Sequence, residues 1–240
     1  MPDLLRTLLA PVLLVQGKRM FARMPRLAPP APLADGPCGD GPGLSLLLVG
    51  DSSAAGYGAD RQENALLGQL VERLAARHRV AWQHHARFGS TIPKTTAWLA
   101  KQPAHPVDLA VVAVGLNDVI AGAGLAEWTA GYDRLVGLLQ TRFEAGHVVV
   151  SGLPPVGEFP ALPQPMRFVI GRQRDRHDAA LRALADRTPG VTYVATDASA
   201  AGPLSQGVAV SEVMAADGFH PGPRVYAEWA RRVVEAWAAD

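Results

Sequence analysis

The feature of this sequence that most restricts its fold is a repeated alternation of short apolar runs with longer amphipathic stretches. The short runs are apolar on both faces, as expected of strands buried inside a parallel sheet. The longer stretches place leucine and valine every three or four residues, which predicts helices. The predicted strands are 44–50, 80–86, 107–114, 147–151 and 191–195, and the predicted helices are 63–79, 95–101, 125–145, 167–187 and 224–238. This order predicts an α/β domain with a five-stranded parallel sheet covered by helices on both faces.

Composition excludes several other classes of protein. The chain has 240 residues, of which 48% are hydrophobic, so it can bury a core without disulfides or a structural metal. Its single cysteine, Cys38, rules out a disulfide framework or a zinc cluster within one chain. The formal net charge of +1 lacks the basic excess of a nucleic-acid-binding protein, and we expect no nucleic-acid partner.

The first 43 residues form a separate region ahead of the domain expected over residues 44–240. Residues 4–15 are apolar but interrupted by Arg6, Thr7 and Pro11, and basic residues follow up to Arg26. This run is too short to span a bilayer, and its order of charge and apolar residues is not that of a secretory signal, so a cytoplasmic location is favoured over secretion. Two interpretations remain open: residues 4–26 contact an anionic membrane surface, or they pack as a helix on the domain.

A proline-rich linker is expected over residues 25–42, because six prolines there cannot sustain a helix or a central strand. Cys38 lies inside this linker, so we interpret it as an exposed thiol without a catalytic role.

Candidate reactive residues follow the ends of the predicted strands, where ligands bind in sheets of this kind. Ser52 follows the first strand, Gly89 the second and Asn117 the third, and Asp217 and His220 precede the last helix. A serine hydroxyl needs a base within hydrogen-bond reach, and imidazole has the appropriate pKa. The imidazole needs a carboxylate that fixes its tautomer, which Asp217 could supply from three residues away. These residue types together point to acyl transfer.

Attack on an ester creates an oxyanion, which requires donors already in place. The backbone N–H groups of Ser52 and Gly89 and the side-chain amide of Asn117 are the candidates, one from each strand end. Asp51 and Asp118 are interpreted as structural residues that hydrogen-bond the loop backbone near this site.

Four short blocks in this order resemble the SGNH hydrolases, the GDSL-type esterases and lipases. The blocks are Gly50-Asp51-Ser52, Gly89 within FGST, Gly115-Leu116-Asn117-Asp118 and Asp217-Gly218-Phe219-His220-Pro221. The resemblance implies a flavodoxin-like three-layer α/β/α fold and ester hydrolysis without metal or cofactor, with Ser52, Asp217 and His220 as the triad. One position departs from the family name: Ser53 stands where the nickname has leucine, so Ser53 must be distinguished from Ser52 as the nucleophile.

No cofactor or metal site is predicted from the remaining motifs. His84 and His85 would point to opposite faces of a strand, which does not suit one ion. The glycines near residue 122 lack the third glycine of a dinucleotide site, and the loop after the first strand lacks the lysine of a triphosphate site.

The sequence predicts the substrate class less specifically than the type of reaction. Residues 152–171 are apolar and proline-rich at the catalytic edge, and two interpretations are open: an acyl pocket or an ordinary packed connection. The side chains suited to an acyl chain are Val156, Phe159, Leu162, Met166 and Phe168. The leading hypothesis is an esterase for small or lipid-like carboxylic esters. The alternatives are an acyltransferase, a carbohydrate deacetylase and a non-catalytic binding module on the same fold.

Overall fold

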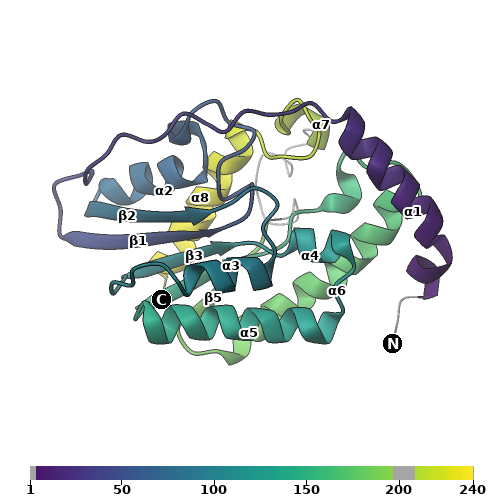
Figure 1. The fold of residues 1–240 in the computed structure, drawn as a ribbon. Helices are drawn as coiled ribbons and strands as arrows, with labels where there is room; N and C mark the ends of the chain where they lie inside the picture. The colour runs from purple at the N-terminus through teal and green to yellow at the C-terminus, as the bar shows by residue number, and fades with distance from the viewer. Residues whose placement is uncertain (1–3, 197–208, 240) are drawn as a thin grey trace.

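The computed structural model describes residues 4–196 and 209–239, and these ranges contain a five-stranded sheet with all strands parallel (Figure 1). The strand order is β2-β1-β3-β4-β5, which is the flavodoxin-like order. The strands are β1 (Gly43–Gly50), β2 (Arg79–Ala86), β3 (Leu109–Ala113), β4 (His147–Ser151) and β5 (Val191–Val194). The predicted five-stranded parallel sheet is therefore confirmed.

Two layers of helices cover the sheet, one on each face. Successive side chains of each strand point to opposite faces, so each strand contributes apolar side chains to both layers. Leu47 and Val49 of β1 join one apolar core with α3, α5 and α6, whereas Leu46 and Leu48 join the other with α2 and α8. The longer helices are α1 (Leu4–Arg23), α2 (Leu66–Ala75), α3 (Ile92–Leu99), α5 (Leu125–Arg142), α6 (Met166–Arg187) and α8 (Pro223–Ala238). The shorter ones are η1 (Gln62–Asn64), α4 (Leu116–Ala121), η2 (Val156–Glu158) and α7 (Val210–Val213).

The helix expected over 63–79 is shorter than predicted. It divides into η1 and α2, because Ala65 adopts an extended backbone between them. At its other end the chain turns after Ala75 into β2, which begins at Arg79.

Helix α4 was not predicted at all. It is only six residues long and directly follows β3, so its sequence contains too few apolar repeats to reveal a helix. It matters here because Asn117 lies in its first turn.

The N-terminal helix α1 packs on the domain, chiefly against α6 (Figure 1). Leu13 and Met20 join the core, and Gln16 bonds with the backbone of Gln164 and Met166. No helix in the described ranges combines the length and apolar character needed to cross a bilayer. The proline-rich stretch then runs along the domain and meets β2 through paired backbone hydrogen bonds between Cys38 and Val80.

Candidate active site

The loops after β1, β2 and β3 lie at one edge of the sheet because these three strands end in register. Gly50 pairs with Ala86 on one side and with Ala113 on the other. The residues that follow, Ser52 after β1 and Asn117 after β3, are thereby brought together, as the sequence predicts for the carboxyl edge of a parallel sheet.

Ser52, His220 and Asp217 form a continuous line of hydrogen-bonding groups. His220 Nε2 lies 2.9 Å from Ser52 Oγ, and His220 Nδ1 lies 2.5 Å from Asp217 Oδ2. All three residues are buried. This contact is made by Ser52 rather than by Ser53, so the His220 imidazole hydrogen-bonds only to the first of the two adjacent serines.

The loop that carries Asp217 and His220 is fixed by its own backbone. Asp217 Oδ1 accepts the N–H groups of Phe219 and His220, both at 3.0 Å. Burial acts to raise the pKa of Asp217, but the hydrogen bonds from the His220 ring and from these N–H groups outweigh it and hold the pKa below its usual value. Asp217 therefore remains a carboxylate at neutral pH, which suits the partner of an imidazole that must gain a proton.

The serine loop and the histidine loop approach each other so closely that one position requires glycine. Gly58 has φ +103°, and a Cβ atom there would lie 2.1 Å from the carbonyl oxygen of Pro221. On the same loop, the Tyr226 hydroxyl donates to the Tyr57 carbonyl at 2.6 Å. These contacts hold Ser52 and His220 at a fixed separation.

Of the residues that carry the three candidate oxyanion donors, Ser52 and Asn117 line one pocket. Within the described chain, the backbone N–H groups of Ser52 and Gly89 donate no hydrogen bond. The Asn117 amide donates to the Ser90 carbonyl at 2.9 Å, and its distance to Asp51 Oδ2 is a long 3.5 Å. One hydrogen of the amide is therefore committed and the other can serve an incoming oxyanion. Gly89 has φ +66° and is exposed, and it does not line the pocket beside Ser52.

Asp51 and Asp118 both support loop backbone, as expected from the sequence. Asp51 Oδ1 accepts the Ser53 N–H at 3.0 Å, and both oxygens of Asp118 accept the Ile92 N–H at the start of α3, at 3.2 and 3.1 Å. Burial raises the pKa of Asp51 to about 7, against the opposing effects of the Ser53 N–H and the His220 charge. Burial also raises the pKa of Asp118 to about 6.

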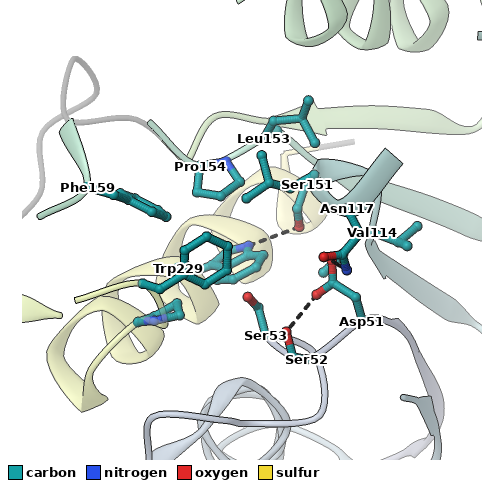
Figure 2. A pocket seen from close by; sticks show the side chains of 15 residues that line it. Asp51, Ser52, Ser53, Val114, Asn117, Ser151, Leu153, Pro154, Phe159 and Trp229 are labelled. Atoms are coloured by element: carbon teal, nitrogen blue, oxygen red, sulfur yellow. Dashed lines mark hydrogen bonds between the residues drawn. The ribbon is translucent and has the colours of Figure 1, made fainter. Parts of the chain in front are cut away.

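A pocket opens beside Ser52, and Figure 2 shows the side chains around it. Ser52, Asn117 and Asp51 lie along one side, with Trp229, Phe159 and other apolar residues around the rest. The Trp229 indole N–H donates to Ser151 Oγ at 2.9 Å, which fixes the ring. The pocket is partly open to solvent and has a volume of about 40 Å³, room for roughly a few water molecules.

Residues 152–171 contribute to this pocket through a different set of side chains from the one predicted. Of the five proposed residues only Phe159 lines it, together with Gly152, Leu153 and Pro154. Val156, Leu162 and Met166 face the core, and Phe168 is exposed on α6. The segment folds back through η2, so its apolar spacing serves packing rather than the pocket. The backbone of Leu153 is held by Asp178, which accepts its N–H at 2.7 Å.

Aromatic rings surround the imidazole of His220, which sequence reasoning did not anticipate. The ring centroids of Tyr57, Phe88 and Phe219 lie 5.9, 5.9 and 5.3 Å from that of His220. Phe88 is 63% exposed and precedes Gly89, so it stands at the mouth of the site. In the sequence, the only indication that Phe88 lies near the site is its position next to Gly89.

In the described ranges, no three His, Cys, Asp or Glu side chains are grouped so that they could hold a metal ion. His84 Nε2 contacts the Ala54 carbonyl at 2.9 Å, and the His85 ring stands edge-on against Trp98. The two rings thus have separate packing partners.

Comparison with known proteins identifies the family of this chain. The GDSL-like lipase/acylhydrolase family matches residues 48–228. A GDSL-like esterase of Mycobacterium tuberculosis is 30% identical over 198 residues, which cover 77% of this chain and 58% of that protein. The chain therefore spans less than two thirds of that relative's length.

Solved structures share the fold. A protein described as a putative arylesterase from Agrobacterium tumefaciens matches with a TM-score of 0.60 and 22% identity, over 82% of this chain and 99% of its own. A catalytic mutant of an acetylxylan esterase from Geobacillus stearothermophilus matches with a TM-score of 0.61 and 20% identity, over 82% and 95%.

Proposed function

Because the chain belongs to the GDSL-like lipase/acylhydrolase family, we propose that it is a serine esterase that hydrolyses carboxylic esters through an acyl-enzyme. The observation that carries the proposal is the line from Ser52 Oγ through the His220 ring to the Asp217 carboxylate, at 2.9 and 2.5 Å. A buried serine in contact with an imidazole that is itself held by a carboxylate has the geometry of an activated nucleophile.

In the first half of the reaction, Ser52 Oγ attacks the ester carbonyl carbon while His220 Nε2 takes the hydroxyl proton. The carbonyl oxygen becomes an oxyanion, which accepts hydrogen bonds from the Ser52 and Gly89 N–H groups and from the Asn117 amide. The Asp217 carboxylate stabilises the imidazolium that forms. Collapse of the intermediate breaks the bond to the alcohol oxygen, which receives the proton from His220 and leaves.

In the second half, water replaces the alcohol. His220 takes a proton from the water as its oxygen attacks the acyl carbon, and the same three donors hold the second oxyanion. Return of the proton to Ser52 Oγ releases the carboxylic acid and restores the free enzyme.

The size of the pocket favours a short acyl group. About 40 Å³ between the Trp229 and Phe159 side chains suits an acetyl-sized group and leaves little room for a long chain. Hydrogen bonds fix two of the walls: the Trp229 indole N–H donates to Ser151 Oγ, and the Leu153 backbone N–H donates to Asp178. We therefore expect the preference for short chains to be strong.

The same observation favours one alternative, removal of acetyl groups from a carbohydrate. An acetyl-sized pocket constrains the acyl part and leaves the alcohol part open, and one structural neighbour is described as an acetylxylan esterase. Transfer of the acyl group to an alcohol instead of water uses the same residues. These alternatives differ only in the alcohol or acceptor that reaches the site.

The deciding experiment measures hydrolysis of p-nitrophenyl esters from acetate to long acyl chains by the wild type, Ser52→Ala and the matched control Ser53→Ala. We expect the acetate to be the best substrate, Ser52→Ala to be inactive and Ser53→Ala to keep most of the activity. Labelling by a fluorophosphonate should follow the same pattern. Loss of labelling in Ser53→Ala but not in Ser52→Ala would overturn the assignment. A folded wild type that neither hydrolyses esters nor reacts with the probe would favour a binding module.

A further inference from the structure

We propose that α1 is an interfacial helix that docks this protein on an anionic membrane surface. The argument begins with exposed apolar side chains. Five of the eight large hydrophobic residues exposed in the described chain lie on this helix: Leu8, Val12, Leu14, Val15 and Phe21. Leu8 is 69% exposed and Leu14 66%, although α1 already packs its opposite side on the domain. A helix that is apolar on both its inner and outer sides needs a second apolar environment.

Three of the five exposed apolar residues are ordered along one face. Leu8, Val12 and Val15 follow one another at spacings of four and three residues, and the same spacing continues to Arg19 and Arg23. One line on the helix surface is thus apolar in its first half and basic in its second. Such a face suits the boundary between lipid tails and headgroups, with the arginines at the headgroup level.

Charge identifies the partner as an anionic surface. Residues 4–34 contain five basic residues and no acidic one. Arg6 faces the domain, but Lys18, Arg19 and Arg23 are exposed and form no ion pair within the described chain. Each basic residue near an anionic bilayer raises the affinity by roughly five-fold, so these three together contribute on the order of 100-fold.

A groove alongside α1 adds to the apolar surface. It measures about 610 Å³ and lies between α1 and the neighbouring helices α4 and α6. Leu14, Lys18 and Phe21 line it from α1, and Ile120 and Ile170 line it from the domain. An acyl chain of a lipid can occupy this groove while Lys18 meets its anionic headgroup.

Docking through α1 brings the candidate active site close to the bilayer. Figure 1 shows α1 beside α4 and α6, at the end of the molecule toward which the strands run. The Arg6 guanidinium donates to the carbonyls of Val119 and Ile120 in α4, the helix whose first turn holds Asn117. The site would then meet esters with a short acyl group on an alcohol that is anchored in the membrane. This last step rests on the proposed function, whereas membrane binding itself does not.

The test is flotation of the purified full chain with vesicles made of equal parts phosphatidylglycerol and phosphatidylcholine, and with vesicles of phosphatidylcholine alone. We expect the wild type to float with the anionic vesicles, less so at high salt, and to stay behind with the neutral ones. Lys18→Gln/Arg19→Gln/Arg23→Gln should lower the partition coefficient on the order of 100-fold. The matched control Arg77→Gln/Arg79→Gln/Lys101→Gln, which removes the same charge from exposed positions elsewhere, should float like the wild type.

A second variant tests the apolar contribution. Leu8→Gln/Val12→Gln/Val15→Gln changes only exposed side chains and should retain the circular dichroism spectrum and melting temperature of the wild type while losing flotation. Ser52→Ala should float like the wild type, so a failure of the proposed esterase activity remains distinguishable. A wild type that does not float overturns the proposal. The proposal is also overturned if the control variant weakens flotation as much as the Lys18→Gln/Arg19→Gln/Arg23→Gln variant does. It is overturned as well if the protein binds no vesicles and forms a dimer in solution that the apolar variant dissociates.

Discussion

The buried carboxyl of Asp51 makes the stability of this protein depend on pH in a direction opposite to that of an ordinary paired aspartate. Asp51 directly precedes Ser52, the proposed nucleophile, and burial raises its pKa from 3.8 to about 7. The perturbation that isolates this effect is Asp51→Asn, which keeps the shape of the side chain and the oxygen that accepts the Ser53 N–H. The substitution removes the group that titrates and replaces Oδ2, which lies 3.5 Å from the Asn117 amide nitrogen, by an amide nitrogen; this second change does not depend on pH.

The direction of the pH dependence follows from the protonation of Asp51 in the folded and unfolded states. Between pH 3.8 and about 7 the folded protein keeps Asp51 protonated while the unfolded chain has released that proton. The raised pKa therefore stabilises the fold fully below about pH 4, and this stabilisation is lost as the pH rises through about 7. A shift of about 3 pH units corresponds to about 4 kcal/mol, at roughly 1.4 kcal/mol per unit.

The assay is urea unfolding of the wild type and Asp51→Asn at a series of pH values from 4 to 8. The difference in unfolding free energy between the two proteins should change by about 4 kcal/mol across this range in favour of the variant, because asparagine does not ionise. The other carboxyl groups are common to both proteins and cancel in the difference. A difference that stays constant with pH would refute the reasoning, since it would mean that Asp51 is ionised in the fold at a normal pKa.

Three further predictions concern Asn117, the proposed oxyanion donor, and two hydrogen-bond contacts of the surrounding structure. Asn117→Ala should lower kcat for p-nitrophenyl acetate on the order of 100- to 1000-fold with a smaller change in KM, and full activity would remove Asn117 from the mechanism. Arg6→Met removes the guanidinium that caps the last carbonyls of α4, and should lower the free energy of unfolding by about 2 kcal/mol in a urea titration, with partial recovery in Arg6→Lys. Tyr132→Phe removes a buried hydroxyl that donates to the Val114 carbonyl at 2.5 Å, and should cost about 1 to 2 kcal/mol in the same assay. An unchanged unfolding curve would contradict either of the last two.

The sheet could be predicted from sequence because its strands are buried on both faces and therefore consist of continuous apolar runs. The strand predicted over 147–151 matches β4 at both ends, and the other four differ by at most two residues at either end. The positions of Ser52 and Asn117 follow from the same pattern, since each lies in the segment that follows a strand and parallel strands present their carboxyl ends at one edge.

The pocket walls could not be predicted in this way, because they depend on side chains from distant elements. Trp229 comes from the middle of α8 and reaches Ser151 at the end of β4, a contact across 78 residues. The apolar spacing of residues 152–171 indicates burial, but it does not say whether the buried side is the core or the pocket. Phe159 borders both the pocket and the core, whereas Val156 borders the core alone, and the two residues lie at either end of the turn through η2.

The N-terminal helix α1 lies outside the residues that match the family, but it makes specific contacts with the domain. The match begins at residue 48, yet Arg6 binds the carbonyls at the end of α4, and Gln16 binds the backbone of Gln164 and Met166. The first contact ends on the helix that carries Asn117, and the second lies on the segment that contributes Phe159 to the pocket. A ligand or surface that displaces α1 would therefore disturb both Asn117, the proposed oxyanion donor, and the proposed wall of the acyl pocket. Since the outer face of α1 is the side left for docking, a membrane can bind there without breaking either contact.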